Sequence, residues 1–120
     1  MRGWLAMIYT LMSISAWASA PQARTLSLDD IRRVETLVKM PPGAGSISGY
    51  NRFYAIKVEA GHEMIWGTFL LTNRSPPLPT IHIVRPEEMP AILDGGCSVV
   101  HLLYDIREAK ITSIFCNGVA

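Results

Sequence analysis

Residues 50–59 and 62–71 read YNRFYAIKVE and HEMIWGTFLL, and Ala60 and Gly61 alone separate them. Both runs are rich in the aromatic and β-branched residues that β-strands favour. Alternate side chains of a strand share a face, and one such face of the first run consists of Tyr50, Tyr54, Ile56 and Val58. A two-residue link ending in glycine is typical of a tight turn between antiparallel strands. The sequence therefore predicts a β-hairpin over residues 50–71, which we call hairpin one.

A helix is predicted before hairpin one. Ser27 and Asp30 have the spacing of a capping box, in which each side chain accepts a hydrogen bond from a backbone N–H at the helix start. The predicted apolar stripe consists of Leu28, Ile31, Val34, Leu37 and Val38, and the residues predicted to lie away from it are Arg32, Arg33, Glu35 and Lys39. Pro41 and Pro42 end the helix because proline has no N–H to donate.

A second hairpin, hairpin two, is predicted from residues 97–104 and 110–116, which flank a polar turn at 105–109. The predicted register places Cys97 opposite Cys116, or offset from it by two residues. In either register strict alternation places Val100, Leu102, Tyr104, Ile111 and Phe115 on one face, and Cys97, Val99, His101, Leu103, Ile114 and Cys116 on the other. The strands bring the two cysteines near one another, so the leading prediction is a Cys97–Cys116 disulfide. A redox-active pair is the alternative, although these cysteines lack the Cys-x-x-Cys spacing that lowers a thiol pKa.

The remaining segments connect these elements. Residues 73–79 contain three prolines, which cannot donate to a strand ladder, so a surface connection is predicted there. Residues 80–84 predict a short strand, and residues 85–96 predict a long loop with one helical turn at Glu87 and Glu88. The predicted fold class is α+β, with one N-terminal helix packed on an antiparallel meander sheet of about four strands and a C-terminal hairpin closed by a disulfide.

Residues 1–18 have the pattern of a signal peptide. Arg2 gives a positive start, and the uncharged apolar run that follows over residues 4–17 is shorter than the roughly 20 residues of a membrane-spanning helix. We predict cleavage after Ala18, with Ala20 as the alternative site. The product is a single small α+β domain over residues 19–120, periplasmic or secreted and without a stable membrane anchor.

The predicted mature chain is electrically balanced. The whole sequence has 11 Lys+Arg and 10 Asp+Glu, and Arg2 is the one charged residue among residues 1–18, so its removal leaves equal numbers. A balanced chain has little long-range attraction for phosphate groups, and no nucleic-acid partner is expected. Recognition of a protein or small-molecule ligand through shape and local groups is predicted instead.

The candidate functional residues lie on turns, loops and strands. The candidate partner-binding residues are Glu59 and Gly61 at the tip of hairpin one and Pro76, Pro77 and Pro79 in the proline-rich connection. His82 and His101 are candidate metal ligands, and a small enzyme could use them with Asp105 or Glu63. No nucleophile signature and no phosphate-binding glycine loop occurs in the sequence, so no catalytic residue and no cofactor are predicted.

The order of helix, hairpin, short strand and disulfide-closed hairpin over residues 27–116 resembles the cystatin-like fold, in which a sheet wraps around one helix. In cystatins the first hairpin tip carries a protease-binding Gln-x-Val-x-Gly motif; residues 57–61 here read KVEAG and keep its final glycine alone. Residues 105–109 lack the Pro-Trp of the second cystatin binding loop, so no inhibitory residue carries over. The segments 40–43 (MPPG), 50–54 (YNRFY), 95–97 (GGC) and 116–118 (CNG) also look like those of small exported bacterial proteins of uncharacterised activity.

The leading hypothesis is an exported, non-catalytic domain that binds a protein or a small ligand, including as an inhibitor. Its predicted binding surface combines the tip of hairpin one with the proline-rich connection and the loop at 85–96. The alternatives are a small periplasmic metal-binding protein or enzyme that uses His82 and His101, and a structural protein of the cell envelope.

Overall fold

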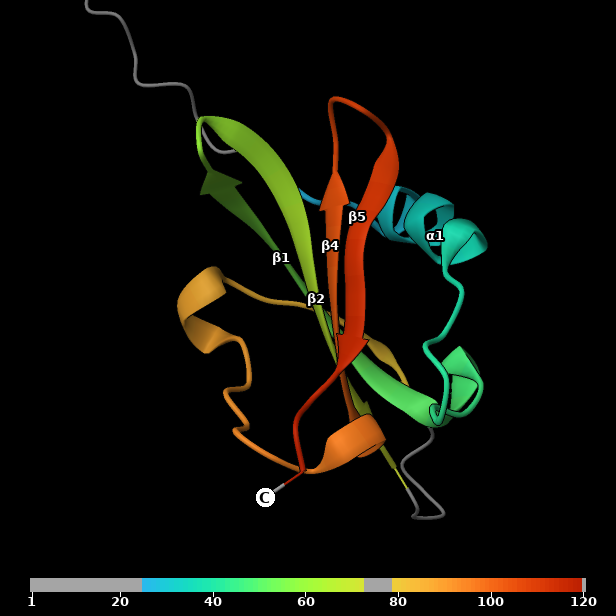
Figure 1. Ribbon diagram of the computed structural model, residues 1–120. Helices are drawn as coiled ribbons and strands as arrows, with labels where there is room; N and C mark the ends of the chain where they lie inside the picture. The colour runs from blue at the N-terminus through green and yellow to red at the C-terminus, as the bar shows by residue number, and fades with distance from the viewer. Residues whose placement is uncertain (1–24, 73–78, 120) are drawn as a thin grey trace, which may run out of the picture.

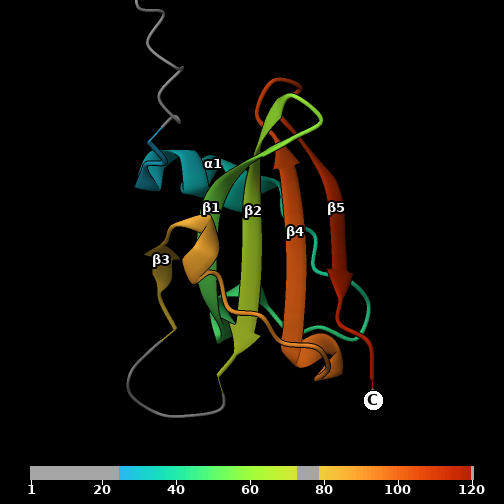
Figure 2. The ribbon, with the colours of Figure 1, turned by 90° about the vertical axis from the view of Figure 1, so that its left-hand side faces the viewer.

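The computed structural model describes residues 25–72 and 79–119. Within them one helix packs on one face of a five-stranded sheet (Figures 1 and 2). The helix and strands are α1 (Leu28–Leu37), β1 (Tyr50–Glu59), β2 (His62–Leu71), β3 (Ile81–Ile83), β4 (Val99–Asp105) and β5 (Lys110–Cys116). Three short 3-10 turns, η1 (Ile47–Gly49), η2 (Pro86–Glu88) and η3 (Gly96–Ser98), lie between them. The predicted α+β class is confirmed.

The sheet has the strand order β3-β1-β2-β4-β5, which corrects the predicted antiparallel meander of about four strands. β4 occupies the free edge of β2, so β3 pairs instead with the far edge of β1, where it runs parallel to that strand. The sheet is therefore mixed, with four antiparallel strands and the short parallel β3 at one edge.

Hairpin one forms as predicted. β1 and β2 pair along their whole lengths, from Tyr50 opposite Leu71 to Glu59 opposite His62. Ala60 and Gly61 between them both have positive φ, at 49° and 78°. Two consecutive residues with positive φ give the turn whose twist matches that of an antiparallel ladder, which explains why two residues suffice.

Hairpin two forms in a different register from the predicted one. Cys116 lies opposite Val100, and a bulge at Thr112 allows Ile111 to pair with Tyr104 while Ser113 pairs with Leu103. The one-residue shift moves Ile114 and Cys116 to the helix-covered face and Phe115 to the outer face, so the predicted faces of these three residues were wrong. The prediction failed because alternation along one strand cannot locate a bulge in it.

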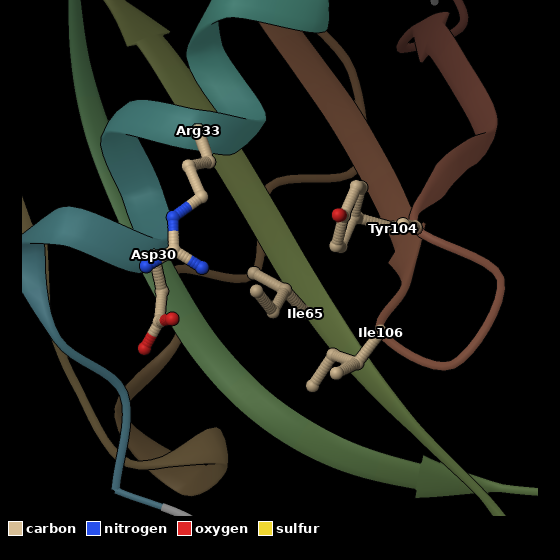
Figure 3. Close-up of a pocket in the computed structure, with 6 residues that line it drawn as sticks. Asp30, Arg33, Ile65, Tyr104 and Ile106 are labelled. Carbon is tan, nitrogen blue, oxygen red and sulfur yellow. The ribbon is translucent and has the colours of Figure 1, made fainter.

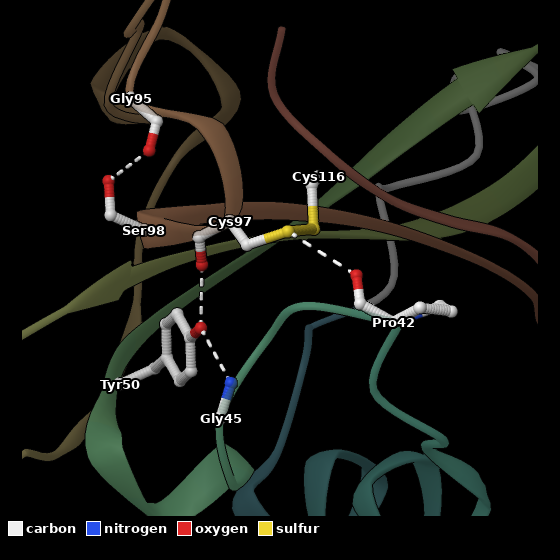
Figure 4. Close-up of a disulfide and its surroundings, with 7 residues drawn as sticks. All are labelled: Pro42, Gly45, Tyr50, Gly95, Cys97, Ser98 and Cys116. Atoms are coloured by element: carbon white, nitrogen blue, oxygen red, sulfur yellow. Dashed lines mark hydrogen bonds between the residues drawn. A yellow bond between two sulfur atoms is a disulfide. The ribbon is translucent and has the colours of Figure 1, made fainter. Parts of the chain in front are cut away.

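The predicted disulfide is confirmed, with the Cα atoms of Cys97 and Cys116 4.6 Å apart (Figure 4). Cys97 lies in η3 rather than in the strand predicted over residues 97–104. The fully buried Tyr50 donates its hydroxyl proton to the Cys97 carbonyl oxygen at 2.6 Å and accepts from the Gly45 N–H at 3.3 Å. The disulfide therefore lies where the start of β1, the loop after α1 and the end of β5 meet.

α1 begins at the predicted capping box. The Ser27 N–H donates to Asp30 Oδ2 at 3.0 Å, and the Asp30 N–H donates to Ser27 Oγ at 3.2 Å. Ile31 and Val34 of the predicted apolar stripe are fully buried against the sheet, whereas Leu28 and Leu37, at its two ends, are exposed. Glu35 also faces the sheet, which corrects its predicted place away from that stripe.

The core lies between α1 and the inner face of the sheet. Its buried members are Leu26, Ile31, Val34, Tyr50, Tyr54, Ile65, Phe69, Val100 and Leu102. Gly67 on β2 leaves the space that the rings of Tyr54 and Phe69 fill, because a Cβ there would lie 3.2 Å from one ring and 3.1 Å from the other. The two rings meet edge to face at 5.6 Å.

The outer face of the sheet is covered in part by residues 84–95, which we call the strap. The strap crosses the side of the sheet opposite α1 and carries η2 (Figures 1 and 2). The Val84 N–H donates to the Tyr54 carbonyl oxygen at one end, and the Asn117 amide donates to the carbonyl oxygens of Ile92 and Asp94 at the other. Met89, between these anchors, is buried.

Candidate binding groove

Two hollows adjoin one another where hairpin one meets the turn of hairpin two. The first has a volume of about 270 Å³ and is lined by Asp30, Arg33, Ile65, Tyr104, Ile106 and Ala109 (Figure 3). The second has a volume of about 240 Å³ and is lined by Gly61, His62, Glu63, Ile106 and Arg107. Ile106 lines both, and we call the pair of hollows the groove.

The position of the β4–β5 turn follows from its pairing with β2. Met64 lies opposite Asp105, and the Ile106 N–H continues this ladder to the Glu63 carbonyl oxygen at 3.4 Å. The buried Asp105 accepts from the Glu108 N–H at 3.0 Å, which fixes the turn from inside. The turn thus brings Ile106 and Arg107 against the start of β2.

The groove contains two arginines that form no ion pair with the rest of the described chain. Of the arginines that the structure describes, Arg32, Arg52 and Arg85 form ion pairs, with Asp29, Glu35, and Glu87 and Glu88 respectively. Arg33 and Arg107 form no ion pair with any described residue, and each lines one of the hollows. A guanidinium group without a carboxylate partner is suited to bind one from a ligand.

The groove also has two carboxylates. Asp30 Oδ2 accepts hydrogen bonds from the Ser27 N–H and hydroxyl, so this carboxylate is held in the helix cap. Glu63 lines the second hollow beside Arg107, so each hollow is lined by one arginine and one carboxylate.

The first hollow combines apolar walls with two hydrogen-bond donors. Ile65 is 2% exposed and lies beneath the space between α1 and β4. Tyr104 extends from β4 toward that space, and Arg33 extends from α1 on the side of Asp30 (Figure 3). The Tyr104 hydroxyl forms no hydrogen bond within residues 25–72 and 79–119, so it is available to a ligand.

The residues predicted to bind a partner are not all brought together. Gly61 lines the second hollow. Glu59, by contrast, lies on the outer face of hairpin one and pairs with Lys57 at 3.7 Å. Pro79 is half-buried before β3, and Pro76 and Pro77 lie outside the described residues.

The two candidate metal ligands lie in one row across the outer face of the sheet. The row pairs His82, Phe53, Thr68, His101 and Phe115 on β3, β1, β2, β4 and β5. His82 stacks on Phe53 at 4.6 Å, and the centroids of the His101 and Phe115 rings lie 5.3 Å apart. Three strand spacings, about 14 Å, separate the histidines, so one metal ion cannot bind both in this arrangement.

Thr68, at the centre of this row, is fully buried, and its hydroxyl has no hydrogen-bond partner among the described residues. Among those residues, no group of three or more His, Cys, Asp or Glu side chains has a metal-binding arrangement.

An interior polar cluster joins α1 to β1. Arg52 donates to both carboxylate oxygens of Glu35, from Nε at 2.8 Å and from Nη2 at 3.1 Å. The Tyr54 hydroxyl donates to the same carboxylate at 2.7 Å. Burial raises the pKa of Tyr54, and its hydrogen bond to Glu35 raises it further. The cluster satisfies its own charges, so we assign it a structural role.

The raised pKa of Tyr54 predicts a loss of stability in alkali. Unfolded tyrosine loses its proton near about pH 10, whereas the folded protein keeps this proton to higher pH. The contribution of protonated Tyr54 to the free energy of unfolding is therefore fully present below about pH 10. Above this pH it falls by up to about 1.4 kcal/mol per pH unit. We expect Tyr54→Phe to remove this part of the decline in urea unfolding curves measured from about pH 8 to about pH 11. If the free energy of unfolding fell equally with pH in the unaltered protein and in Tyr54→Phe, Tyr54 would not be the cause of the decline.

The sequence did not indicate the main groove residues. Arg33 was predicted to lie on the solvent side of α1, and Ile106 and Arg107 were assigned to a polar turn. Their meeting depends on the β2–β4 pairing, which joins distant parts of the chain and leaves no local pattern. The one available signal was the apolar Ile106 within an otherwise polar turn.

No protein-family model matches the chain, and no curated protein or solved structure is significantly similar to it. The cystatin-like resemblance therefore stays a prediction. No helix within the described residues is long and apolar enough to cross a membrane. The predicted signal peptide, residues 1–18, lies outside the described part of the chain.

Proposed function

We propose that this protein is an exported, non-catalytic binding module that holds a short segment of a partner protein in the groove. The observation that carries the proposal is the presence, in a groove with apolar walls, of Arg33 and Arg107, which form no ion pair within the described residues. Apolar walls with a few convergent polar groups are the usual composition of a binding pocket. The groove suits a segment with one apolar side chain close to a negative charge.

The proposed compartment is the periplasm or the extracellular space. The Cys97–Cys116 disulfide is of the kind that persists where the environment is oxidising. The sequence pattern of residues 1–18 supplies the export signal that this location requires.

The proposal also specifies which face of the molecule binds. The groove opens between α1 and the two hairpin turns, whereas His82 and His101 lie on the outer face. A ligand in the groove leaves the histidine row untouched, so the two surfaces can be told apart by experiment.

An NMR titration tests this proposal. A pool of random hexapeptides with free termini is added to the isotope-labelled protein, and we expect the amide signals of Gly61, Ile106 and Ala109 to shift. Arg33→Ala is expected to weaken the shifts, whereas Arg32→Ala, next to it on α1 and paired with Asp29, should leave them unchanged. The proposal fails if no signal shifts or if the shifts fall on His82 and His101 instead.

A further inference from the structure

We infer that the first hollow binds the C-terminal residue of a partner chain, with its free carboxylate on Arg33 and its aliphatic side chain against Ile65. This inference rests on the proposed function and names the part of the partner that is recognised.

The size of the hollow favours a single residue. Pockets for drug-sized ligands have volumes of roughly 300–1,000 Å³. The first hollow, at about 270 Å³, is smaller than this range. The second hollow, reached past Ile106, offers a similar volume for the preceding residue. The groove therefore has room for the end of a peptide in extended form.

The donors of the first hollow suit a carboxylate. Arg33 offers a planar pair of N–H groups, which bind two carboxylate oxygens side by side. The Tyr104 hydroxyl, which extends toward the same space, can donate to an oxygen of the same group (Figure 3). Neither donor has a partner within residues 25–72 and 79–119, so binding breaks no ion pair or hydrogen bond in that part of the chain.

The closeness of donor and apolar wall selects a chain terminus over an acidic side chain. A C-terminal residue has its carboxylate and its side chain on one Cα, so both fit a hollow lined at once by Arg33, Ile65 and Ile106. In an internal Leu-Asp pair the carboxylate and the apolar side chain stand on two Cα atoms about 3.8 Å apart, so they are farther from one another than in a C-terminal leucine. Capture of a C-terminal carboxylate is an established mode of peptide recognition.

Three acetylated peptides test the inference by fluorescence-detected or calorimetric titration. The first is Gly-Ser-Gly-Leu with a free carboxylate, the second is the same sequence as an amide, and the third is Gly-Leu-Asp-Gly as an amide. We expect the free acid to bind at least about tenfold more tightly than either amide. Amidation removes the terminal carboxylate that Arg33 binds, and the aspartate of the third peptide is too far from its leucine for both to occupy the first hollow.

Substitutions in the protein complete the test. Arg33→Ala should abolish the preference for the free acid and leave the weak binding of the amide unchanged, as expected when one pair of groups interacts directly. Tyr104→Phe should reduce the preference by a smaller factor, because one hydroxyl is removed and the ring remains. Arg32→Ala is the matched control and should bind all three peptides like the unaltered protein.

The outcomes separate the inference from the proposed function. Equal binding of the free acid and its amide, or stronger binding of the aspartate peptide, would overturn C-terminal recognition while leaving the groove a binding site. Failure of all three peptides, when the random hexapeptides still shift the groove signals, would likewise overturn the inference alone. Failure of the peptides and of the random pool together would overturn both.

Discussion

Replacing Arg52 with alanine is expected to lower the free energy of unfolding by about 3 kcal/mol, because it leaves the Glu35 carboxylate nearly buried without its counter-charge. The side chains of Arg52 and Glu35 are 13% and 16% exposed, so water can compensate for little of the loss. Arg52 also donates from Nη1 to the backbone carbonyl oxygens of Ile47 and Tyr50, and the alanine variant loses these two hydrogen bonds as well.

Arg85 provides the matched control for this experiment. Its Nε lies 2.7 Å from Glu88, close to the 2.8 Å between Arg52 Nε and Glu35. The Arg85 and Glu88 side chains are, however, 74% and 50% exposed. Because water and salt screen exposed ion pairs, Arg85→Ala should change the free energy of unfolding far less than Arg52→Ala does. Urea unfolding of both variants measures the difference.

A double variant tests whether the cost comes from the unpaired charge. Glu35→Leu together with Arg52→Met removes both charges, and we expect it to recover at least half of the stability that Arg52→Ala loses. Equal losses for Arg52→Ala and Arg85→Ala would show that the interior cluster does not stabilise the helix on the sheet.

Reduction of the Cys97–Cys116 disulfide is expected to cost about 3 kcal/mol, since it releases a closed loop of about 20 residues in the unfolded chain. For a domain of this size the loss corresponds to a fall in melting temperature on the order of 15 °C. Calorimetry or circular dichroism with and without a thiol reductant measures it.

The surroundings of the disulfide suggest how the reduced protein would differ. The Cys97 sulfur lies 3.5 Å from the Pro42 carbonyl oxygen, and a Cβ at Gly43 would lie 3.2 Å from the same sulfur. The loop after α1 therefore packs directly on the bridge (Figure 4). A variant with both cysteines replaced by serine should match the reduced protein and should not respond to reductant. An unchanged melting temperature on reduction would contradict a stabilising role.

Local patterns predicted the parts of this fold that local chemistry determines. The capping box of Ser27 and Asp30 and the Ala60–Gly61 turn each depend on a few consecutive residues, and both are confirmed. The disulfide prediction is also confirmed, although the register on which it partly rested was wrong. It succeeded because the chain has two cysteines and a predicted hairpin limits how far apart they can lie.

The errors concern choices that depend on the whole fold. Glu35 faces inward because Arg52 and Tyr54 on β1 supply it with partners, and these partners come from a different element. The parallel pairing of β3 depends on β4 occupying the edge of β2. Arg33 and Tyr104 line the same hollow because β4 pairs with β2, and local propensity and periodicity do not predict such a long-range pairing.

The order of strands in the sheet also bears on how fast the protein folds. Hairpins one and two each pair neighbouring segments, whereas the β2–β4 ladder must join one hairpin to the other across all the intervening chain. Long-range pairings of this kind form slowly, because the entropy cost of closing the loop comes before the stabilising contacts form. Until β2 pairs with β4, β2 is an unpaired edge strand that carries the apolar residues Ile65 and Phe69. An unpaired apolar edge strand readily pairs with strands of other chains. Formation of the β2–β4 ladder therefore competes with aggregation. Because aggregation involves two or more chains, the yield of refolding should fall as protein concentration rises.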